Sequence, residues 1–277
     1  MSNSELSSGC HNSARPAQQD VHQSIGRARR EGVKKSFAGV GGHRMKSRLL
    51  FALFFLSLGA DLVLIGPHPD WRMLPAALVA WYVADMVSGL VHMYMDYRPC
   101  IPGTGVRELY FWEGPRDSPE FRALQAAVYT RISTFERIVY DFKRHHPNPD
   151  QLGRNGNFQL MKEPVFLSTL PVSLLLNLVF LLVPTPGWLI VGVVVLILGA
   201  SMTQVFHATL HRRDVGFCVR AMRRLGLLMS VSAHKLHHDT LRKDFSVISG
   251  WSNPAVNLCA TLLLRIGALR SEGLEPT

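Results

Sequence analysis

The sequence contains few cysteines and few acidic residues, and each shortage narrows what the chain can be. Four cysteines occur in 277 residues, with no CxxC pair and no regular spacing: Cys10, Cys100, Cys218 and Cys259. They indicate neither a disulfide framework nor a cysteine-ligated zinc ribbon. Asp and Glu number 20 against 30 Lys and Arg, so the formal net charge is +10. A nucleic-acid-binding chain would interleave basic with aromatic residues or show a known binding motif, and because this sequence does neither, we expect no nucleic-acid partner.

Long apolar runs dominate the middle of the chain. Four of them are long enough, at about 1.5 Å of helix rise per residue, to cross a hydrocarbon core of about 30 Å. They cover residues 49–66, 73–95, 164–183 and 187–206. Two further apolar stretches, 217–236 and 254–269, are interrupted by arginines, so we expect interfacial or shallow helices there. The sequence therefore predicts an all-α integral membrane protein with about four transmembrane helices plus interfacial and cytoplasmic helices.

The Lys and Arg residues lie almost entirely on one side of the four predicted spans. Nine occur through Arg48, ten in 97–163 and ten after His211, whereas the two short loops on the opposite side hold only Arg72. Because basic residues concentrate on the cytoplasmic side of a membrane protein, we predict that the N-terminus and the 97–163 segment are cytoplasmic. This orientation also accounts for the positive net charge. Arg outnumbers Lys by 23 to 7, which favours a bacterial inner membrane over the endoplasmic reticulum.

The two ends of the chain differ in composition from the apolar middle. Residues 1–47 contain too little apolar surface to form a core, so we predict a disordered basic cytoplasmic tail. A second short tail is expected at 271–277. The membrane domain then covers 48–270 and includes a polar insertion at about 97–142.

The insertion is expected to contain one amphipathic helix. Ser118-Pro119 is typical of a helix N-cap followed by proline at the first helical position. Apolar residues then recur at spacings of three and four over 119–142, a pattern that predicts a helix with one apolar face. We expect this helix to lie on the membrane surface or over the functional site.

Eight of the twelve histidines occur where the predicted topology brings them to the cytoplasmic ends of the spans. They form four groups in the sequence: His92; His145 and His146; His207 and His211; and His234, His237 and His238. The last three have i, i+3, i+4 spacing, which places the rings on one face of a helix. Imidazole binds iron, zinc and copper well, and neither a packed core nor a solvated surface often needs three histidines within five residues. We therefore predict a shared metal site, with a histidine-rich helix end that binds no metal as the alternative.

A polar stripe on the second predicted span points to the same site. Asp85, Gly89, His92 and Asp96 follow one another at i, i+4, i+7 and i+11 on one face of the helix. Asp96 is expected to be either an oxygen ligand or a hydrogen-bond partner that fixes a histidine tautomer, and we favour the second role. Asp85 and Asn155 are lesser candidates for catalytic residues. Asp85 is equally well explained by a structural role in satisfying N–H groups.

The number of candidate ligands favours two metal ions over one. Eight imidazoles and a carboxylate are too many for one ion with a coordination number of four to six. His145 and His146 are adjacent and cannot share a helix face, so one ring is expected at each ion. A histidine-rich ligand set with few thiolates, beside a membrane, suits iron that activates oxygen better than structural zinc. A zinc metalloprotease would require an HExxH motif, which is absent, whereas a structural or transported metal remains open.

Four sequence motifs contain the eight histidines. They are ADMVSGLVHMYMD at 84–96, FKRHHPNP at 142–149 with NGN at 155–157, QVFHATLH at 204–211, and HKLHH at 234–238 with FSVISGWSNP at 245–254. Together, and in this order over roughly residues 73–257, they resemble the motifs of the plasmanylethanolamine desaturase (Kua-type) lipid desaturase family. All eight family histidines have counterparts here. The stretch between Asp96 and His145 departs from the family, because it is about twice as long as expected.

The resemblance implies a membrane di-iron enzyme that uses O2 and two external electrons to remove two hydrogens from a lipid chain. Family members convert the alkyl-ether chain of plasmanylethanolamine to the vinyl ether of plasmalogens, and a plastid relative desaturates an acyl chain of phosphatidylglycerol near its ester. The eight histidines would hold the two iron ions. The sequence has no haem, flavin or iron–sulfur motif, so a protein of the cytochrome b5 or ferredoxin type would supply the electrons. A desaturase or hydroxylase of another lipid and a non-enzymatic metal-binding membrane protein are the alternatives, and no oligomeric state is predicted.

Overall fold

The structure, a computed structural model, describes residues 45–66 and 70–274. Most of the predicted disordered tail 1–47 lies outside the described residues, as do residues 275–277 of the predicted C-terminal tail. Within the described ranges all regular structure is helical and no strand is present. The prediction of an all-α fold is therefore confirmed for this part of the chain.

Four helices in the described ranges are long and apolar enough to cross a membrane, which confirms the predicted number of spans. They are Met45–Ile65, α2 (Met73–Tyr97), the continuous helix Asn157–Leu182 and α9 (Gly187–Leu210). Asn157–Leu182 comprises α7 (Asn157–Pro164), the π-helical turn η1 (Val165–Thr169) and α8 (Leu170–Leu182), so this span begins upstream of its predicted start. The π-helical turn follows Pro164, which has no N–H to donate to the helical ladder.

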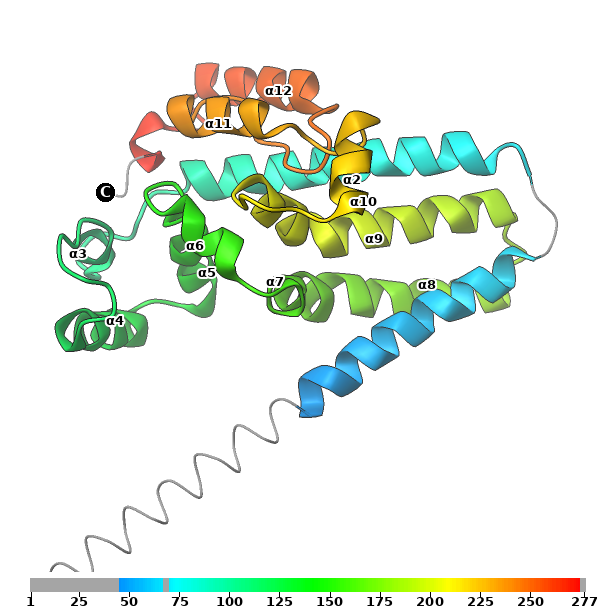
Figure 1. Cartoon of the computed structure of the whole chain (residues 1–277), viewed down its shortest axis with the longest axis horizontal. Coiled ribbons are helices and arrows are strands. Elements are labelled where there is room, and N and C mark those ends of the chain that lie inside the picture. The colour runs from blue at the N-terminus through cyan, green and yellow to red at the C-terminus, as the bar shows by residue number, and fades with distance from the viewer. Residues whose placement is uncertain (1–44, 67–69, 275–277) are drawn as a thin grey trace, which may run out of the picture. The chain divides into compact units, whose positions relative to one another are not determined.

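The spans α2 and α9 lie side by side and run in the same direction (Figure 1). Small residues permit a close approach, because a Cβ added to Gly199 of α9 would lie only 2.7 Å from the Cβ of Ala84 in α2. Both helices carry histidines near their C-terminal ends. Their parallel pairing therefore brings His92 of α2 to the same level as His207 of α9.

The predicted helix over 119–142 is two helices. Ser118 caps α4 (Pro119–Arg131) as predicted, since its hydroxyl accepts the N–H of Phe121 at 3.1 Å. The chain then breaks, and Ser133 caps α5 (Thr134–Lys143) by accepting the N–H of Glu136. The apolar spacing continued through this break, so it did not reveal the second cap. With α3 (Val106–Tyr110), the two helices enclose a small apolar core: Cys100, Val106, Leu109, Tyr110, Phe121, Val128, Ile132 and Tyr140.

The segment after α9 forms three short helices. The stretch 217–236 contains α10 (Phe217–Arg224) and the first part of α11 (Val231–Thr240), separated by a turn at Gly226, whose φ is +71°. The third helix, α12 (Asn253–Arg265), packs along the second half of α2, and Val256 and Ala260 are buried there with Met93 and Tyr97. The short helix α12 therefore covers one side of the histidine-bearing part of α2.

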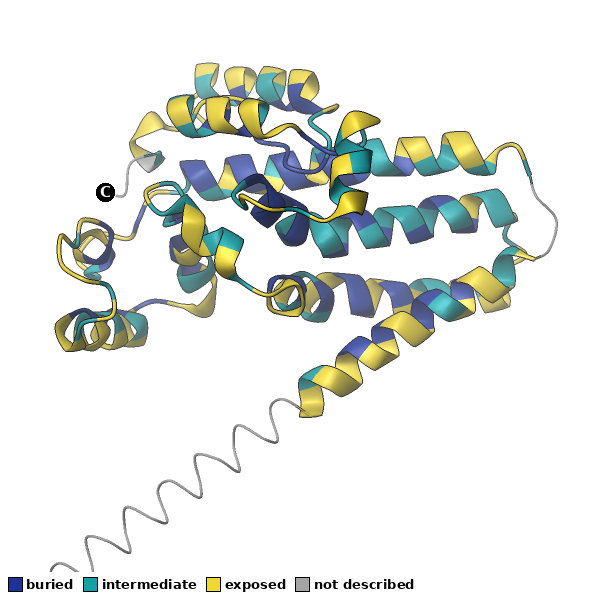
Figure 2. Cartoon of the chain, viewed as in Figure 1, coloured by how far each residue is buried: buried dark blue, intermediate teal, exposed yellow. Residues whose placement is uncertain are grey.

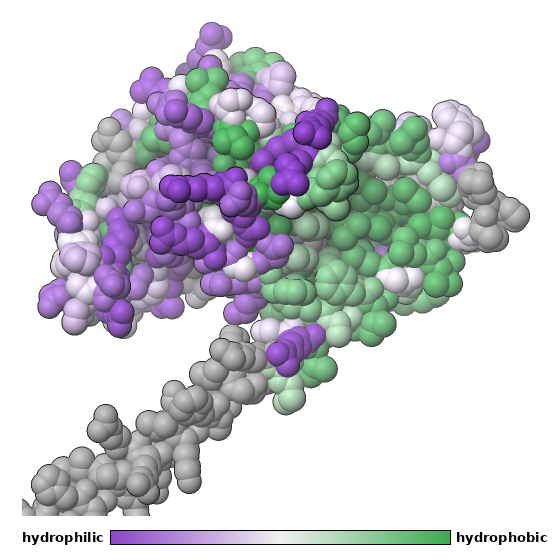
Figure 3. Space-filling model, viewed as in Figure 1, coloured by the Kyte–Doolittle hydropathy of each residue, from purple (hydrophilic) through white to green (hydrophobic). Residues whose placement is uncertain are grey.

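On the face shown in Figure 3, apolar side chains cover the spans and hydrophilic side chains gather over α3 to α6, and Figure 2 shows exposed residues along the spans. Leu56, Leu181 and Leu182, all on spans, are 71%, 70% and 73% exposed. Such large continuous apolar surfaces are unfavourable in water and are typical of contact with lipid. The four apolar helices indicate a membrane protein, and the short helix α6 (Pro149–Arg154) belongs to its polar part.

Candidate metal centre

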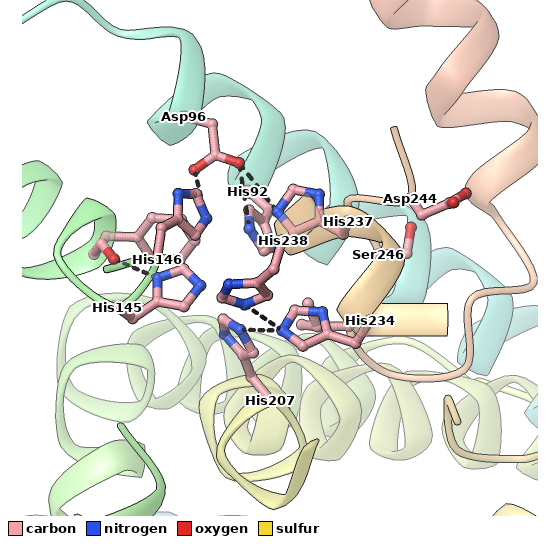
Figure 4. A network of polar contacts seen from close by, with 12 residues as sticks. His92, Asp96, His145, His146, His207, His234, His237, His238, Asp244 and Ser246 are labelled. Atoms are coloured by element: carbon pink, nitrogen blue, oxygen red, sulfur yellow. Dashed lines mark hydrogen bonds and ion pairs between the residues drawn. The ribbon is translucent and has the colours of Figure 1, made fainter. Parts of the chain in front are cut away.

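The structure brings all eight predicted histidines together at the C-terminal ends of α2 and α9 (Figure 4). They divide into two groups, and within each group one ligand atom per residue lies within 4.8 Å of the others. The five-histidine group is His145, His207, His211, His234 and His238, and the Asp96 group is His92, Asp96, His146 and His237. The adjacent His145 and His146 fall in different groups, as their spacing predicted. The groups are neighbours, with 5.3 Å between the ring centroids of His92 and His207.

Local helix geometry explains how α11 contributes rings to both groups. Ser230 begins this helix by accepting the N–H of Ala233 with its hydroxyl. The i, i+3, i+4 spacing then directs the three histidine rings of α11 to one face. His234 and His237 are 1% and 0% exposed, so this face is turned inward.

In the five-histidine group, the Nε2 atoms of three rings surround the Nε2 of His234. The separations are 3.1 Å to His207, 3.0 Å to His211 and 3.1 Å to His238. A neutral imidazole nitrogen either donates or accepts, so His234 Nε2 pairs well with only one of these neighbours. The other close nitrogen pairs repel unless a cation lies between them. With metal–nitrogen bonds of about 2.1 Å, the length in zinc–histidine sites, ligands at a right angle lie about 3.0 Å apart, so the spacing fits a metal ion.

Two backbone carbonyls determine the tautomers of a ring in each group. His145 Nδ1 donates to the carbonyl of Phe142, and His237 Nδ1 donates to the carbonyl of Lys243 at 2.8 Å. In a neutral ring the other nitrogen, Nε2, then carries a lone pair. The Nε2 atoms of His145 and His237 are buried and form no hydrogen bond within the described residues. Both are therefore available to a metal.

The carboxylate of Asp96 faces three rings without forming a hydrogen bond within the described residues. Oδ2 lies 3.4 Å from His92 Nε2 and 3.5 Å from His237 Nε2, and Oδ1 lies 3.6 Å from His146 Nε2. Since His237 Nε2 carries a lone pair, it cannot donate to this carboxylate. A carboxylate that is 1% exposed is costly without a partner. The arrangement is compatible with an oxygen ligand of a metal, one of the two roles considered for Asp96 from the sequence.

Burial keeps the rings outside the spans in the neutral form that binds metal. It lowers the pKa of His211 to about 4 and that of His238 to about 3, from an ordinary value of 6.5. The pKa values of His145 and His234 are lowered as well, because burial and the neighbouring imidazoles disfavour the charged ring. Metal ligation requires neutral imidazole. The donor sets of both groups therefore fit a bound metal ion.

Asp85 lies in neither group and anchors a loop. Its Oδ1 accepts the backbone N–H groups of Ile248, Ser249 and Gly250, and its Oδ2 accepts the N–H and the hydroxyl of Ser252, all at 2.7–3.1 Å. This carboxylate is 0% exposed and fully paired. It joins the loop between α11 and α12 to α2, two turns before His92, which matches the structural alternative considered for Asp85.

Asn155 also lies outside both groups, in the turn between α6 and α7. Its backbone carbonyl accepts Arg212 Nη2 at 2.8 Å, and Arg212 Nε donates to the carbonyl of Gly153 at 2.9 Å. Arg212 directly follows His211, so it holds this turn against the end of α9. Sequence reasoning missed Arg212 and the carbonyls of Phe142 and Lys243. A basic residue beside a histidine and a main-chain oxygen have no distinctive sequence pattern.

Comparisons with known proteins show which family the chain resembles. Residues 129–263 match the family described as a lipid desaturase domain, and this stretch contains every histidine of the two groups except His92. The chain is 24% identical over 199 residues to a plasmanylethanolamine desaturase from Myxococcus xanthus. The similarity covers 68% of this chain and 57% of that relative, so the chain spans little more than half the relative's length. No solved structure matches. These findings confirm the predicted resemblance to the lipid desaturase family of the plasmanylethanolamine desaturase type.

Proposed function

We propose that this protein is an O2-dependent di-iron lipid desaturase that converts plasmanylethanolamine to the vinyl ether of plasmenylethanolamine. The observation that carries the proposal is the pair of adjacent groups of buried donors, one with five histidines and one with three histidines and Asp96. The lipid desaturase domain supports the class of reaction. The name of the Myxococcus xanthus relative supports the substrate.

In this proposal each group holds one iron ion, and bound iron supplies the activation of O2. Reduction of O2 to two waters takes four electrons, of which the lipid chain provides two with its two hydrogens and an external donor provides two. The chain's own residues hold the site in place and keep water out. His145 and His237 present lone pairs because their Nδ1 atoms donate to backbone carbonyls. Asp96 contributes negative charge to its group and is assigned as an oxygen ligand.

The position of the two groups suits chemistry near the glycerol end of an intact lipid. They lie at the C-terminal ends of two apolar spans, next to the polar helices. The excess of Lys and Arg in the segments on this side supports a cytoplasmic location, in a bacterial inner membrane. A phospholipid in the cytoplasmic leaflet has its glycerol at this depth, so the first carbons of its chains lie close to the two groups.

A basic surface supports an acidic electron-donor protein as partner. Between α9 and α12 the chain exposes six cationic side chains: Arg213, Arg220, Arg224, Lys235, Arg242 and Lys243. Opposite charges steer a small donor to such a surface and raise the association rate at low salt. A cytochrome b5 or ferredoxin type of protein meets this requirement.

Lipid analysis after expression in a host that lacks plasmalogens but contains alkyl-ether lipids tests the proposal. Acid-labile vinyl ethers are expected with the wild-type chain and are expected to be absent with His238→Ala. Unchanged ether lipids together with a new acyl double bond or hydroxyl group would instead assign the chain to the alternative class, acyl-lipid desaturases or hydroxylases. Fewer than two metal ions per purified chain, with no change in any lipid, would leave a non-enzymatic metal-binding protein.

A further inference from the structure

The carbonyl that orients His237 lies in an unfavourable loop. Lys243 follows α11 between Leu241 and Asp244, which have φ values of +54° and +62°. A left-handed backbone is uncommon outside glycine and is least suited to a bulky residue such as leucine. A loop of this kind keeps its conformation only where its surroundings hold it. The contacts that hold it therefore also hold the Lys243 carbonyl on His237 Nδ1.

Two asparagines of α12 hold this loop. Asn257 forms two hydrogen bonds with Asp244: its Oδ1 accepts the backbone N–H at 2.8 Å, and its Nδ2 donates to Oδ1 of the carboxylate at 3.0 Å. Asn253 accepts the N–H of Ser246 at 2.9 Å. The two asparagines, one turn apart on α12, thus bind two backbone N–H groups of this loop, those of Asp244 and Ser246.

The helix that carries these asparagines is itself fixed to the metal-bearing span. Val256 and Ala260 of α12 are 1% exposed and pack with Met93 of α2. Met93 directly follows His92. Buried contacts and hydrogen bonds thus connect α2, through α12 and the loop, to the ring of His237. In this path Asn257 binds Asp244, the residue next to Lys243.

We propose that Asn257 is a positioning residue for the Asp96 group. Through Asp244 it keeps the Lys243 carbonyl on His237 Nδ1, which directs the Nε2 lone pair of His237 at the second metal ion. Without this clamp the strained loop relaxes, the carbonyl leaves the ring, and His237 is free to rotate or to change tautomer. The inference rests on the proposed metal occupancy and extends it to a residue whose side chain hydrogen-bonds Asp244 rather than a ring nitrogen of either group.

The test measures metal binding by the full-length chain purified in detergent. Iron is removed with a chelator, and Co²⁺ is titrated while its visible absorption and the bound metal per chain are recorded. Outer partners of metal ligands typically contribute a factor of about 10–100 to metal affinity. Asn257→Leu is therefore expected to weaken one of the two Co²⁺ sites by about 10–100-fold and to leave the other within about twofold. Thr261→Val, one turn along α12 at an exposed position, is the matched control and should bind like the wild type.

A swapped pair separates positioning from general loss of stability. Asn257→Asp alone removes the amide donor and places two carboxylates together, so it is expected to weaken the same site. In the double variant Asp244→Asn/Asn257→Asp the amide and the carboxylate exchange positions, so an amide again faces a carboxylate. Asparagine also tolerates the positive φ at position 244. The double variant should recover the wild-type Co²⁺ affinity. If Asn257→Leu does not fold, the comparison of the double variant with Asn257→Asp tests the positioning role by itself.

Three results would overturn the inference. Wild-type affinity at both sites in Asn257→Leu, equal weakening of both sites, or a swapped pair no better than Asn257→Asp would each show that Asn257 does not position His237. A wild-type chain that binds fewer than two Co²⁺ ions would instead contradict the proposed metal centre itself. The two failures are thus distinguishable.

Discussion

We expect Asp85→Asn to lower the free energy of unfolding and to leave the five-histidine group and the Asp96 group intact. In Asp85→Asn, the retained oxygen can still accept the N–H groups of Ile248, Ser249 and Gly250. The new amide faces the N–H of Ser252, which at present donates to Oδ2 at 3.0 Å. One buried N–H then lacks an acceptor, at a cost of about 1–3 kcal/mol. For a chain of this size such a cost lowers the melting temperature by about 2–12 °C.

Thermal unfolding in detergent measures this shift, and lipid desaturation is then assayed well below both melting temperatures. There the variant should hold the same metal per chain as the wild type and turn over at a similar rate. Ser88→Ala is the control: it removes a hydroxyl that accepts the N–H of Val247 at 3.4 Å and donates to the Asp85 carbonyl at 2.7 Å but leaves the carboxylate unchanged, so metal content and turnover should match the wild type. A folded, metal-loaded and thermally unchanged Asp85→Asn without activity would refute the loop-anchor role and place this carboxylate in the chemistry.

Three further predictions follow from the packing and the charge states. Gly89→Ala should destabilise the protein by about 1–3 kcal/mol in a thermal unfolding experiment, because the added Cβ would lie 2.3 Å from the Oγ of Ser246. An unchanged melting temperature would mean that the loop between α11 and α12 has room to move. In the folded metal-free chain the pKa values of His211 and His238 are about 4 and about 3, against an ordinary 6.5, so the unfolded chain binds protons more readily. The free energy of unfolding of the metal-free chain should therefore be highest above pH 6.5 and fall as the pH is lowered toward 4. A profile that does not change with pH would contradict this prediction. His211→Ala should lower iron from two ions per chain to one by elemental analysis, whereas loss of both ions would show that the two groups bind metal as one unit.

Periodicity and charge were sufficient to predict where the histidines meet. A helical repeat of 3.6 residues puts His207 and His211 on one face, and the same repeat orders the polar stripe of α2. The excess of Lys and Arg on one side then relates the ends of different spans to one another, which no single helix reveals. Together they predicted that residues far apart in the sequence, such as His92 and His237, share one site.

Apart from the separation of His145 from His146, the division of the donors between the two groups and their orientation could not be predicted in the same way. The role of Asp96 depends on which nitrogen of His237 carries a proton, and a backbone carbonyl of Lys243 decides that. Its position comes from tertiary packing of α12 and from a left-handed backbone at Leu241, a residue type that gives no signal for such a conformation. The break at Ser133 was missed although Ser133 and Glu136 have the S-x-x-E spacing of a capping box, because the apolar spacing continues through the break.

The long insertion is explained by how its two ends are joined. Arg98, just after α2, binds Glu136 of α5 at 2.6 Å, and Lys143, the last residue of α5, donates to the carbonyl of Arg98 at 2.6 Å. Glu136 and Lys143 are 7% and 3% exposed, so the ion pair of the one and the hydrogen bond of the other lie in a largely dry setting. The clamp holds the chain that leaves Asp96 beside the chain that enters His145. Doubling the length of a loop adds only about 0.6 kcal/mol of closure entropy, so a segment with its own core can grow between these ends without separating the ligands on either side.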